Sequence, residues 1–252
     1  FAGIARNMDT EDAFTEGRSA EEWQEWIWEH SRKRAAKLNV NMPDYQSFRE
    51  TGFYKSPELK EDRIFLSDFF NDPDINPLKT PSGKIEIFSR TIDGFNYDNC
   101  PGHPTWMEPA EWLGAKDKTY PLHVISNQPR TKLHSQMDNG AFSSSIKIKG
   151  HQPLEMNPVD AKPRGITEGD IVRVFNGRGA CLCGVNITND VMPGVVIIST
   201  GSWYDPVDPA DPNSMCKHGN PNVLTPDIGT SKLGQGPAAH SCLAEIELYD
   251  GP

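Results

Sequence analysis

The second half of the chain is a series of short apolar segments separated by tight turns, and this pattern limits the possible folds most strongly. Residues 171–175 alternate as a strand does, Asn176-Gly177 is a strong hairpin signal, and residues 181–187 form the expected partner strand. Further strands are predicted at residues 122–126, 154–157, 195–199 and 242–248. Many short strands with tight turns and few helices indicate a closed β-barrel.

The first part of the chain predicts an irregular and partly helical segment. Ser19 and Glu22 fit a capping box, which predicts a helix from there to about residue 38. Its stripe of Trp23, Trp26 and Ile27 either packs the helix on a neighbour or lines a pocket, and helical spacing favours packing. A second short helix is expected at residues 44–50, and a strand at residues 85–88. The regularly spaced strand-like segments begin after residues 116–119. This change predicts one domain over residues 1–118 and a barrel domain over residues 119–252.

Composition excludes several classes of function. The 252 residues carry a formal net charge of −10, which argues against binding nucleic acid through a broad basic surface. The longest apolar run, residues 195–198, is far too short to cross a bilayer. Five cysteines show neither a disulfide framework nor the ligand spacing of a metal site, and the histidines lack that spacing too.

Phe1 and the residues after it resemble the middle of a helix, so we expect an upstream region that would contain any targeting signal. The location of the protein, periplasmic or cytoplasmic, is therefore left open.

Three polar clusters follow predicted strands or interrupt long loops. Amide side chains both donate and accept hydrogen bonds, and glycines let the backbone approach a ligand closely. Each cluster taken alone is also compatible with an ordinary polar loop. The first cluster comprises Ser126, Asn127, Gln128, Arg130, Lys132, His134, Ser135 and Gln136. The second comprises His218, Asn220 and Asn222, and the third is the run 229–236, which ends in Gln235 and Gly236.

These clusters, in this order, resemble the C-terminal pterin-binding region of the dimethyl sulfoxide reductase family of molybdenum enzymes. The segments Leu133-His134-Ser135-Gln136 and His218-Gly219-Asn220-Pro221-Asn222 favour the branch that reduces trimethylamine N-oxide and biotin or methionine sulfoxide. The resemblance implies a mainly β fold with α/β elements, in which a six-stranded double-psi β-barrel follows the irregular segment. It also implies that the three clusters contact molybdopterin guanine dinucleotide. Trp203 and Tyr204 belong to another family-like element, and either stack near this cofactor or cap the barrel.

The resemblance implies a function for a longer protein of which this chain is the C-terminal part. That protein would be an oxidoreductase that takes oxygen from a small S-oxide or N-oxide, with two dinucleotides on one molybdenum. The molybdenum ligand would lie outside this chain, so we nominate no catalytic residue and no metal ligand here, and we expect the isolated chain to be inactive. Its partners would be the missing N-terminal domains and an electron donor. The alternative is a non-catalytic barrel that serves interaction or assembly, and the molybdenum and guanine content of the longer protein distinguishes the two.

Overall fold

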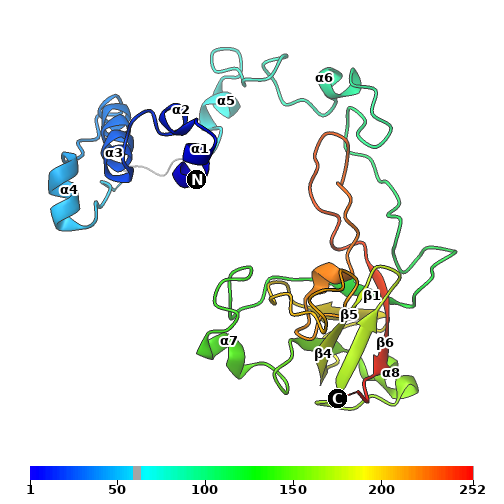
Figure 1. Ribbon diagram of the computed structural model, residues 1–252. Helices are drawn as coiled ribbons and strands as arrows, with labels where there is room; N and C mark the ends of the chain where they lie inside the picture. The colour runs from blue at the N-terminus through cyan, green and yellow to red at the C-terminus, as the bar shows by residue number, and fades with distance from the viewer. Residues whose placement is uncertain (59–63, 252) are drawn as a thin grey trace. The chain divides into compact units, whose positions relative to one another are not determined.

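The computed structural model describes residues 1–58 and 64–251, and the chain divides into two compact units, Phe1–Ile85 and Glu86–Pro252. The first unit contains α1 (Ala2–Asn7), α2 (Glu11–Thr15), α3 (Ala20–Ala36), α4 (Tyr45–Thr51) and α5 (Ser67–Asn71). The second unit begins with α6 (Arg90–Asp93) in a long irregular connector that leads into the strands (Figure 1). The predicted boundary near residues 116–119 stays a prediction.

The helices of the first unit begin where their capping residues predict. Ser19 accepts a hydrogen bond from the N–H of Glu22, whose carboxylate accepts from the N–H of Ser19, so the capping box is complete. Asp44 caps α4 in the same way, through the N–H of Ser47. The long helix and the short one expected from the sequence are therefore confirmed, as α3 and α4.

The predicted packing of the aromatic stripe on α3 is not found, because no residue of α3 is buried. Trp26 is 45% exposed and lies beside Trp23 and the guanidinium of Arg18. The side chain that meets α4 is instead Trp28, whose ring stacks on Phe48 with centroids 3.7 Å apart. Among the described residues of the first unit only Ala5 is buried, so this unit has no hydrophobic core of its own.

The predicted strand at residues 85–88 is wrong. Ile85 and Ile87 are 69% and 81% exposed, and the described residues offer this segment no partner strand. An extended segment becomes a strand only when a neighbour satisfies its backbone groups, which a local apolar pattern does not guarantee.

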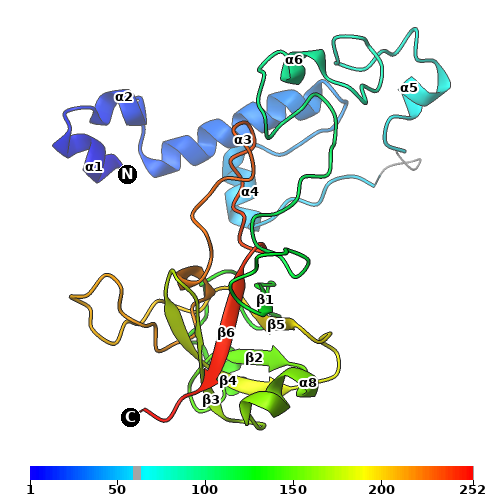
Figure 2. The same cartoon turned by 90° about the vertical axis from the view of Figure 1, so that its right-hand side faces the viewer.

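The second unit is built on a closed six-stranded barrel, counted over residues 86–251. Its strands are β1 (Leu122–Ile125), β2 (Pro153–Met156), β3 (Ile171–Phe175), β4 (Ala180–Ile187), β5 (Val195–Ile198) and β6 (Leu243–Leu248). Their order around the barrel is β1-β5-β2-β4-β3-β6. The pairs β1–β5 and β2–β4 are parallel and the other four pairs are antiparallel. The mixed closed barrel confirms the predicted fold class, and Figure 2 shows β6 crossing it in front of β3 and β4.

The barrel core follows from alternation along the strands. In β3, Val172 and Val174 are fully buried while the residues between and beside them are only partly buried. The hairpin prediction is confirmed, since Phe175 pairs with Ala180 across the turn that begins at Asn176. Asn176 is itself buried and donates to the carbonyls of Leu224 and Leu243, so one side chain fixes the turn to two other segments.

Short helices lie in the connections between strands. These are α7 (Ala141–Ser145), α8 (Pro158–Ala161), and the 3-10 helices η1 (Lys162–Arg164) and η2 (Pro221–Val223). Asn157 caps α8 through the N–H of Val159 and also donates to the carbonyl of Val191, at 2.7 Å. No helix within residues 1–58 and 64–251 combines the length and the apolar character that crossing a bilayer requires.

Candidate functional site

Two polar hollows lie among the loops of the barrel unit. The first cavity has a volume of about 520 Å³ and is bounded by segments that follow β1, follow β5 and precede η2. Its lining residues are His134, Ser135, Thr200, Gly201, Ser202, Trp203, Tyr204, Asn220 and Asn222. The structure therefore brings parts of the first and second predicted clusters to one place, and adds Trp203 and Tyr204 to them.

Local backbone features shape the first cavity. Gly201 has φ +95°, and a Cβ atom there would lie 1.7 Å from the carbonyl oxygen of His134, so only glycine allows the two walls to meet. On the other side, the Asn220 side chain accepts from the N–H of Asn222 at 2.9 Å and thereby begins η2, with Pro221 in its first position. This turn places Asn222 on the cavity lining.

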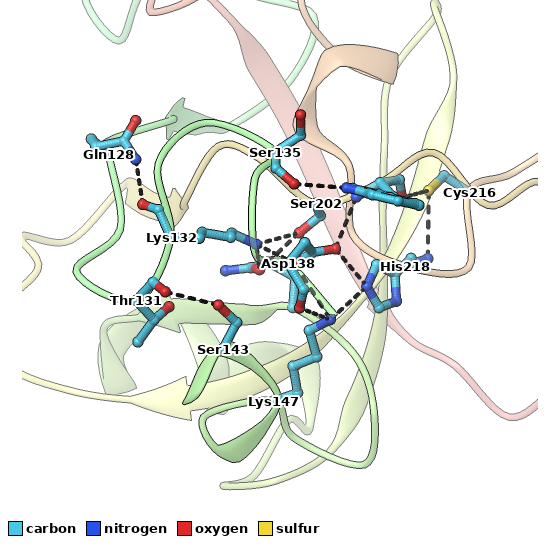
Figure 3. A network of polar contacts seen from close by, with 12 residues as sticks. Gln128, Thr131, Lys132, Ser135, Asp138, Ser143, Lys147, Ser202, Cys216 and His218 are labelled. Atoms are coloured by element: carbon cyan, nitrogen blue, oxygen red, sulfur yellow. Dashed lines mark hydrogen bonds and ion pairs between the residues drawn. The ribbon is translucent and has the colours of Figure 1, made fainter. Parts of the chain in front are cut away.

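Behind the first cavity lies a buried network of charged side chains (Figure 3). Asp138 is fully buried, and its carboxylate accepts from Lys132 at 2.6 Å, from the N–H of Trp203 at 3.1 Å and contacts His218 at 3.1 Å. Lys147 lies 3.4 Å from the same carboxylate and 2.8 Å from the Nε2 atom of His218. The network thus joins residues 132–147 to Trp203 and His218, which are remote from them in sequence.

The network sets the protonation of its members. Burial raises the pKa of Asp138, but the hydrogen bonds from Lys132 and Trp203 and the charge of Lys147 outweigh it and lower the pKa from 3.8 to about 2. Burial and then the ammonium group of Lys147 lower the pKa of His218. With His218 neutral, two ammonium groups face one carboxylate, which leaves an excess of positive charge behind the cavity wall.

The second cavity, of about 640 Å³, lies beside the turn after β1. Asn127, Gln128 and Arg130 of the first cluster line it, together with the apolar side chains of Phe142, Ile146 and Ile148. The other lining residues are Pro129, Thr131, Gln152, Pro153, Glu155, Asn186 and Ser199. The Oγ1 atom of Thr131 is buried and lacks a hydrogen-bond partner among the residues that the structure describes. A buried hydroxyl without a partner is costly, and it marks a place where a ligand group would be stabilised.

Side chains of the predicted clusters make hydrogen bonds that fix the loops around the cavities. Asn127 accepts from the hydroxyl of Ser199 at 2.7 Å, and Gln128 donates to the carbonyl of Lys132 at 2.7 Å. Lys132 also donates to Gln152 at 2.9 Å, and its side chain is only 1% exposed. Lys132 therefore lies between the two cavities with protein partners, and its predicted contact with a cofactor stays a prediction.

Other predicted residues lie outside both cavities. Ser126 donates its N–H to His240 at 3.4 Å, and Gln136 is exposed. Gln235 donates to the carbonyls of Ser231 and Lys232, within a loop that Lys232 fastens to Asp98 at 2.8 Å. The structure thus joins the first two clusters but does not bring Gln235 or Gly236 to them, and their contact with a cofactor also stays a prediction.

Sequence reasoning missed the residues that organise the site. Asp138, Lys147 and Gln152 are isolated polar residues in the sequence, with no spacing that relates them. Only the folded chain places them around Lys132 and His218. The described residues contain no group of three or more His, Cys, Asp or Glu side chains arranged to hold a metal ion.

Comparison with known proteins identifies the barrel. Residues 122–243 match the family model described as "Molydopterin dinucleotide binding domain". Residues 122–243 therefore form a molybdopterin dinucleotide-binding domain. This domain binds a molybdopterin cofactor, and the predicted resemblance is confirmed.

Relatives of the dinucleotide-binding domain are similar over this whole chain. Dimethyl sulfoxide/trimethylamine N-oxide reductase of Cereibacter sphaeroides is 44% identical over an alignment of 253 positions, which covers 100% of this chain and 31% of that protein. Trimethylamine-N-oxide reductase 1 of Escherichia coli (strain K12) is 42% identical, with 100% of this chain and 30% of that protein covered. Biotin sulfoxide reductase of Cereibacter sphaeroides is 40% identical, with 100% and 33% covered. The chain therefore spans about a third of the length of these relatives.

A solved structure supports the fold of the chain. Acetylene hydratase from Pelobacter acetylenicus superposes with a TM-score of 0.61 at 17% identity, and the match covers 82% of this chain and 28% of that one. At this identity the likeness concerns the fold alone.

Proposed function

We propose that this chain is the C-terminal part of a molybdenum oxidoreductase that reduces S-oxides or N-oxides, and that its barrel holds the guanine dinucleotide of the cofactor. The observation that carries the proposal is identity of 40–44% along the entire chain to relatives named as reductases of dimethyl sulfoxide, trimethylamine N-oxide and biotin sulfoxide. The rest of the longer protein, the electron donor and the oxide are its proposed partners.

The residues of the two cavities fit such a cofactor. Pterin and guanine present donors and acceptors side by side, which the amides of Asn127, Gln128 and Asn222 match in both directions. The hydroxyl of Thr131 lacks a partner that a polar ligand group would supply. An excess of buried positive charge behind Ser202 favours an anionic diphosphate in the adjacent cavity.

In this proposal His134, Ser135, Asn220 and Asn222 hold one part of a dinucleotide in the first cavity, and Asn127, Gln128 and Arg130 hold another in the second. Gln235 and Gly236 remain proposed contacts that would reach the cofactor from outside both cavities. Two dinucleotides are proposed per molybdenum, with the metal ligated by residues outside this chain. When bound, the molybdenum group supplies the two-electron oxygen-atom transfer, while the residues of this chain bind and orient it.

Activity assays of the longer protein and of the isolated chain test the proposal. The longer protein, reduced by a viologen dye, is expected to consume trimethylamine N-oxide, dimethyl sulfoxide or biotin sulfoxide. The isolated 252-residue chain is expected to consume none of them. Absence of turnover by the longer, metal-loaded protein with all three oxides would contradict the proposed reaction. Robust turnover by the isolated chain would contradict the proposed division of roles.

A further inference from the structure

The buried carboxylate of Asp138 connects the two opposite walls of the first cavity. One wall is the segment 132–135, which Asp138 reaches through the ammonium group of Lys132 at 2.6 Å. The other wall is the segment 200–204, which it reaches through the N–H of Trp203 at 3.1 Å. Neither Asp138 nor Lys132 lines the cavity itself. Their effect on a ligand must therefore pass through the residues that do.

Two further contacts join the same walls, one at Ser202 and the other at Ser135 (Figure 3). The Lys132 ammonium lies 3.3 Å from the hydroxyl of Ser202, which in turn donates to Gln152 at 2.7 Å. The indole N–H of Trp203 donates to the carbonyl of Ser135 at 2.7 Å. The two walls cannot move closer together at this point, because the backbone of Gly201 already lies against the backbone of His134.

The charges around Asp138 make the connection depend on its carboxylate. Lys132 and Lys147 have side chains that are 1% and 7% exposed, and Asp138 is the acidic group that both of them contact. Neutralising Asp138 would leave two buried ammonium groups beside each other, and His218 is the only other titratable side chain within residues 1–58 and 64–251 that contacts the carboxylate. We expect the walls to separate so that water reaches these groups.

We propose that Asp138 is a positioning residue, which fixes the distance between the segments 132–135 and 200–204 and so determines how tightly the domain retains its dinucleotide. This inference rests on the proposed function, since it concerns the same cofactor. Loss of a group that orients direct ligands lowers affinity on the order of tenfold to a hundredfold in metal sites, and we expect about a tenfold loss here.

The test compares variants of the full-length protein purified with its cofactor. The variant is Asp138→Asn, and the matched control is Asp160→Asn, whose carboxylate accepts from the N–H of Gly194 at 2.7 Å away from both cavities. Two quantities are measured: the guanine nucleotide retained per protein after gel filtration, and amide hydrogen exchange. We expect Asp138→Asn to lose nucleotide and to exchange faster at residues 131–138 and 200–204, with unchanged exchange in β2 and β4. Asp160→Asn is expected to retain nucleotide.

A double variant separates positioning from charge balance. Asp138→Asn with Lys147→Met removes one negative and one positive charge, so it restores the net charge of the wild-type network, but the single amide oxygen cannot accept from both Lys132 and Trp203. We expect it to remain poor in nucleotide. Restored nucleotide in the double variant would overturn the proposal, as would wild-type retention and exchange in Asp138→Asn. Faster exchange throughout the barrel strands in both variants would also overturn it, because Asp138 would then support the whole fold. A wild-type protein without guanine nucleotide would instead refute the proposed function.

Discussion

Glu111 and Arg178 form a bidentate ion pair that links the connector before β1 to the β3–β4 turn. The two guanidinium nitrogens lie 2.5 and 2.9 Å from the carboxylate oxygens, and one of those oxygens also accepts from the N–H of Leu243 at the start of β6. The hydrogen bond from Arg178 lowers the pKa of Glu111 despite its partial burial. The irregular segment that precedes the barrel is therefore attached to it at a defined point.

Glu111→Gln is expected to destabilise the barrel unit. The amide keeps one acceptor but loses the charge that the Arg178 guanidinium pairs with, and both side chains are partly exposed, so we expect a loss of about 1 kcal/mol in the free energy of unfolding. Urea titration followed by circular dichroism measures it. Glu108→Gln is the matched control, because its carboxylate accepts a hydrogen bond from the half-buried Trp112 indole and pairs with no arginine or lysine among the described residues. Equal effects of the two substitutions would contradict this role of Glu111.

Gly201→Ala is expected to be among the most damaging single substitutions in the barrel unit. The added methyl group would collide with the carbonyl of His134 in a backbone conformation that alanine rarely adopts. We expect a loss of about 2–4 kcal/mol in unfolding free energy. Gly169→Ala separates the two causes, because Gly169 has φ +79° but open space around its Cβ position. That control should cost about 1 kcal/mol, the backbone strain alone. A similar loss for both would show that steric contact at Gly201 contributes little.

Acid is expected to weaken the fold through Asp138. Its pKa in the folded chain is lowered from 3.8 to about 2, so the folded state holds fewer protons than the unfolded state between these values. The carboxylate therefore stabilises the fold above about pH 4, and this contribution of about 2 kcal/mol is lost as the pH falls through about 2. Urea titrations at a series of pH values measure the slope. Asp138→Asn should lack this component, and an identical pH slope in that variant would argue against it.

Asn222→Ala is expected to weaken cofactor retention without affecting the barrel core. Asn222 lines the first cavity and is exposed, so its loss removes one or two hydrogen bonds to a ligand, worth about 1–2 kcal/mol or roughly tenfold in affinity. Guanine nucleotide retained by the full-length protein after gel filtration is the measurement. Asn213→Ala, an exposed amide in the loop 205–215, serves as the control. Equal retention by the two variants would remove Asn222 from the proposed site.

The sequence predicts the barrel well because its signals are local. Alternation around Val172 and Val174 and the turn at Asn176 depend on neighbouring residues, and the structure confirms both. The order of the strands depends instead on contacts between distant segments, and the family resemblance implies only the type of barrel. The strand predicted at Ile85 and Ile87 failed for the same reason, since a local apolar pattern does not create a partner strand.

The candidate site was predicted in part. Polar residues such as Asn127 and Asn222 follow strand ends or glycine-containing turns, where ligand-binding loops are common. The sequence alone therefore indicates them as candidate binding residues. Asp138 and Gln152 carry no such signal, because their role comes from burial beside Lys132. Lys132 itself was predicted to face a ligand, whereas its ammonium group has three protein partners. A charged side chain near a binding loop can thus stabilise the loop through buried hydrogen bonds to protein groups without contacting the ligand.

The guanine nucleotide and molybdenum content of the purified full-length protein tests the central claim most directly. Acid hydrolysis followed by chromatography and elemental analysis gives both quantities on one sample. The proposed cofactor predicts two guanine nucleotides for each molybdenum atom. A protein that is fully folded yet contains neither guanine nucleotide nor molybdenum would contradict the account and would favour a barrel that serves interaction or assembly.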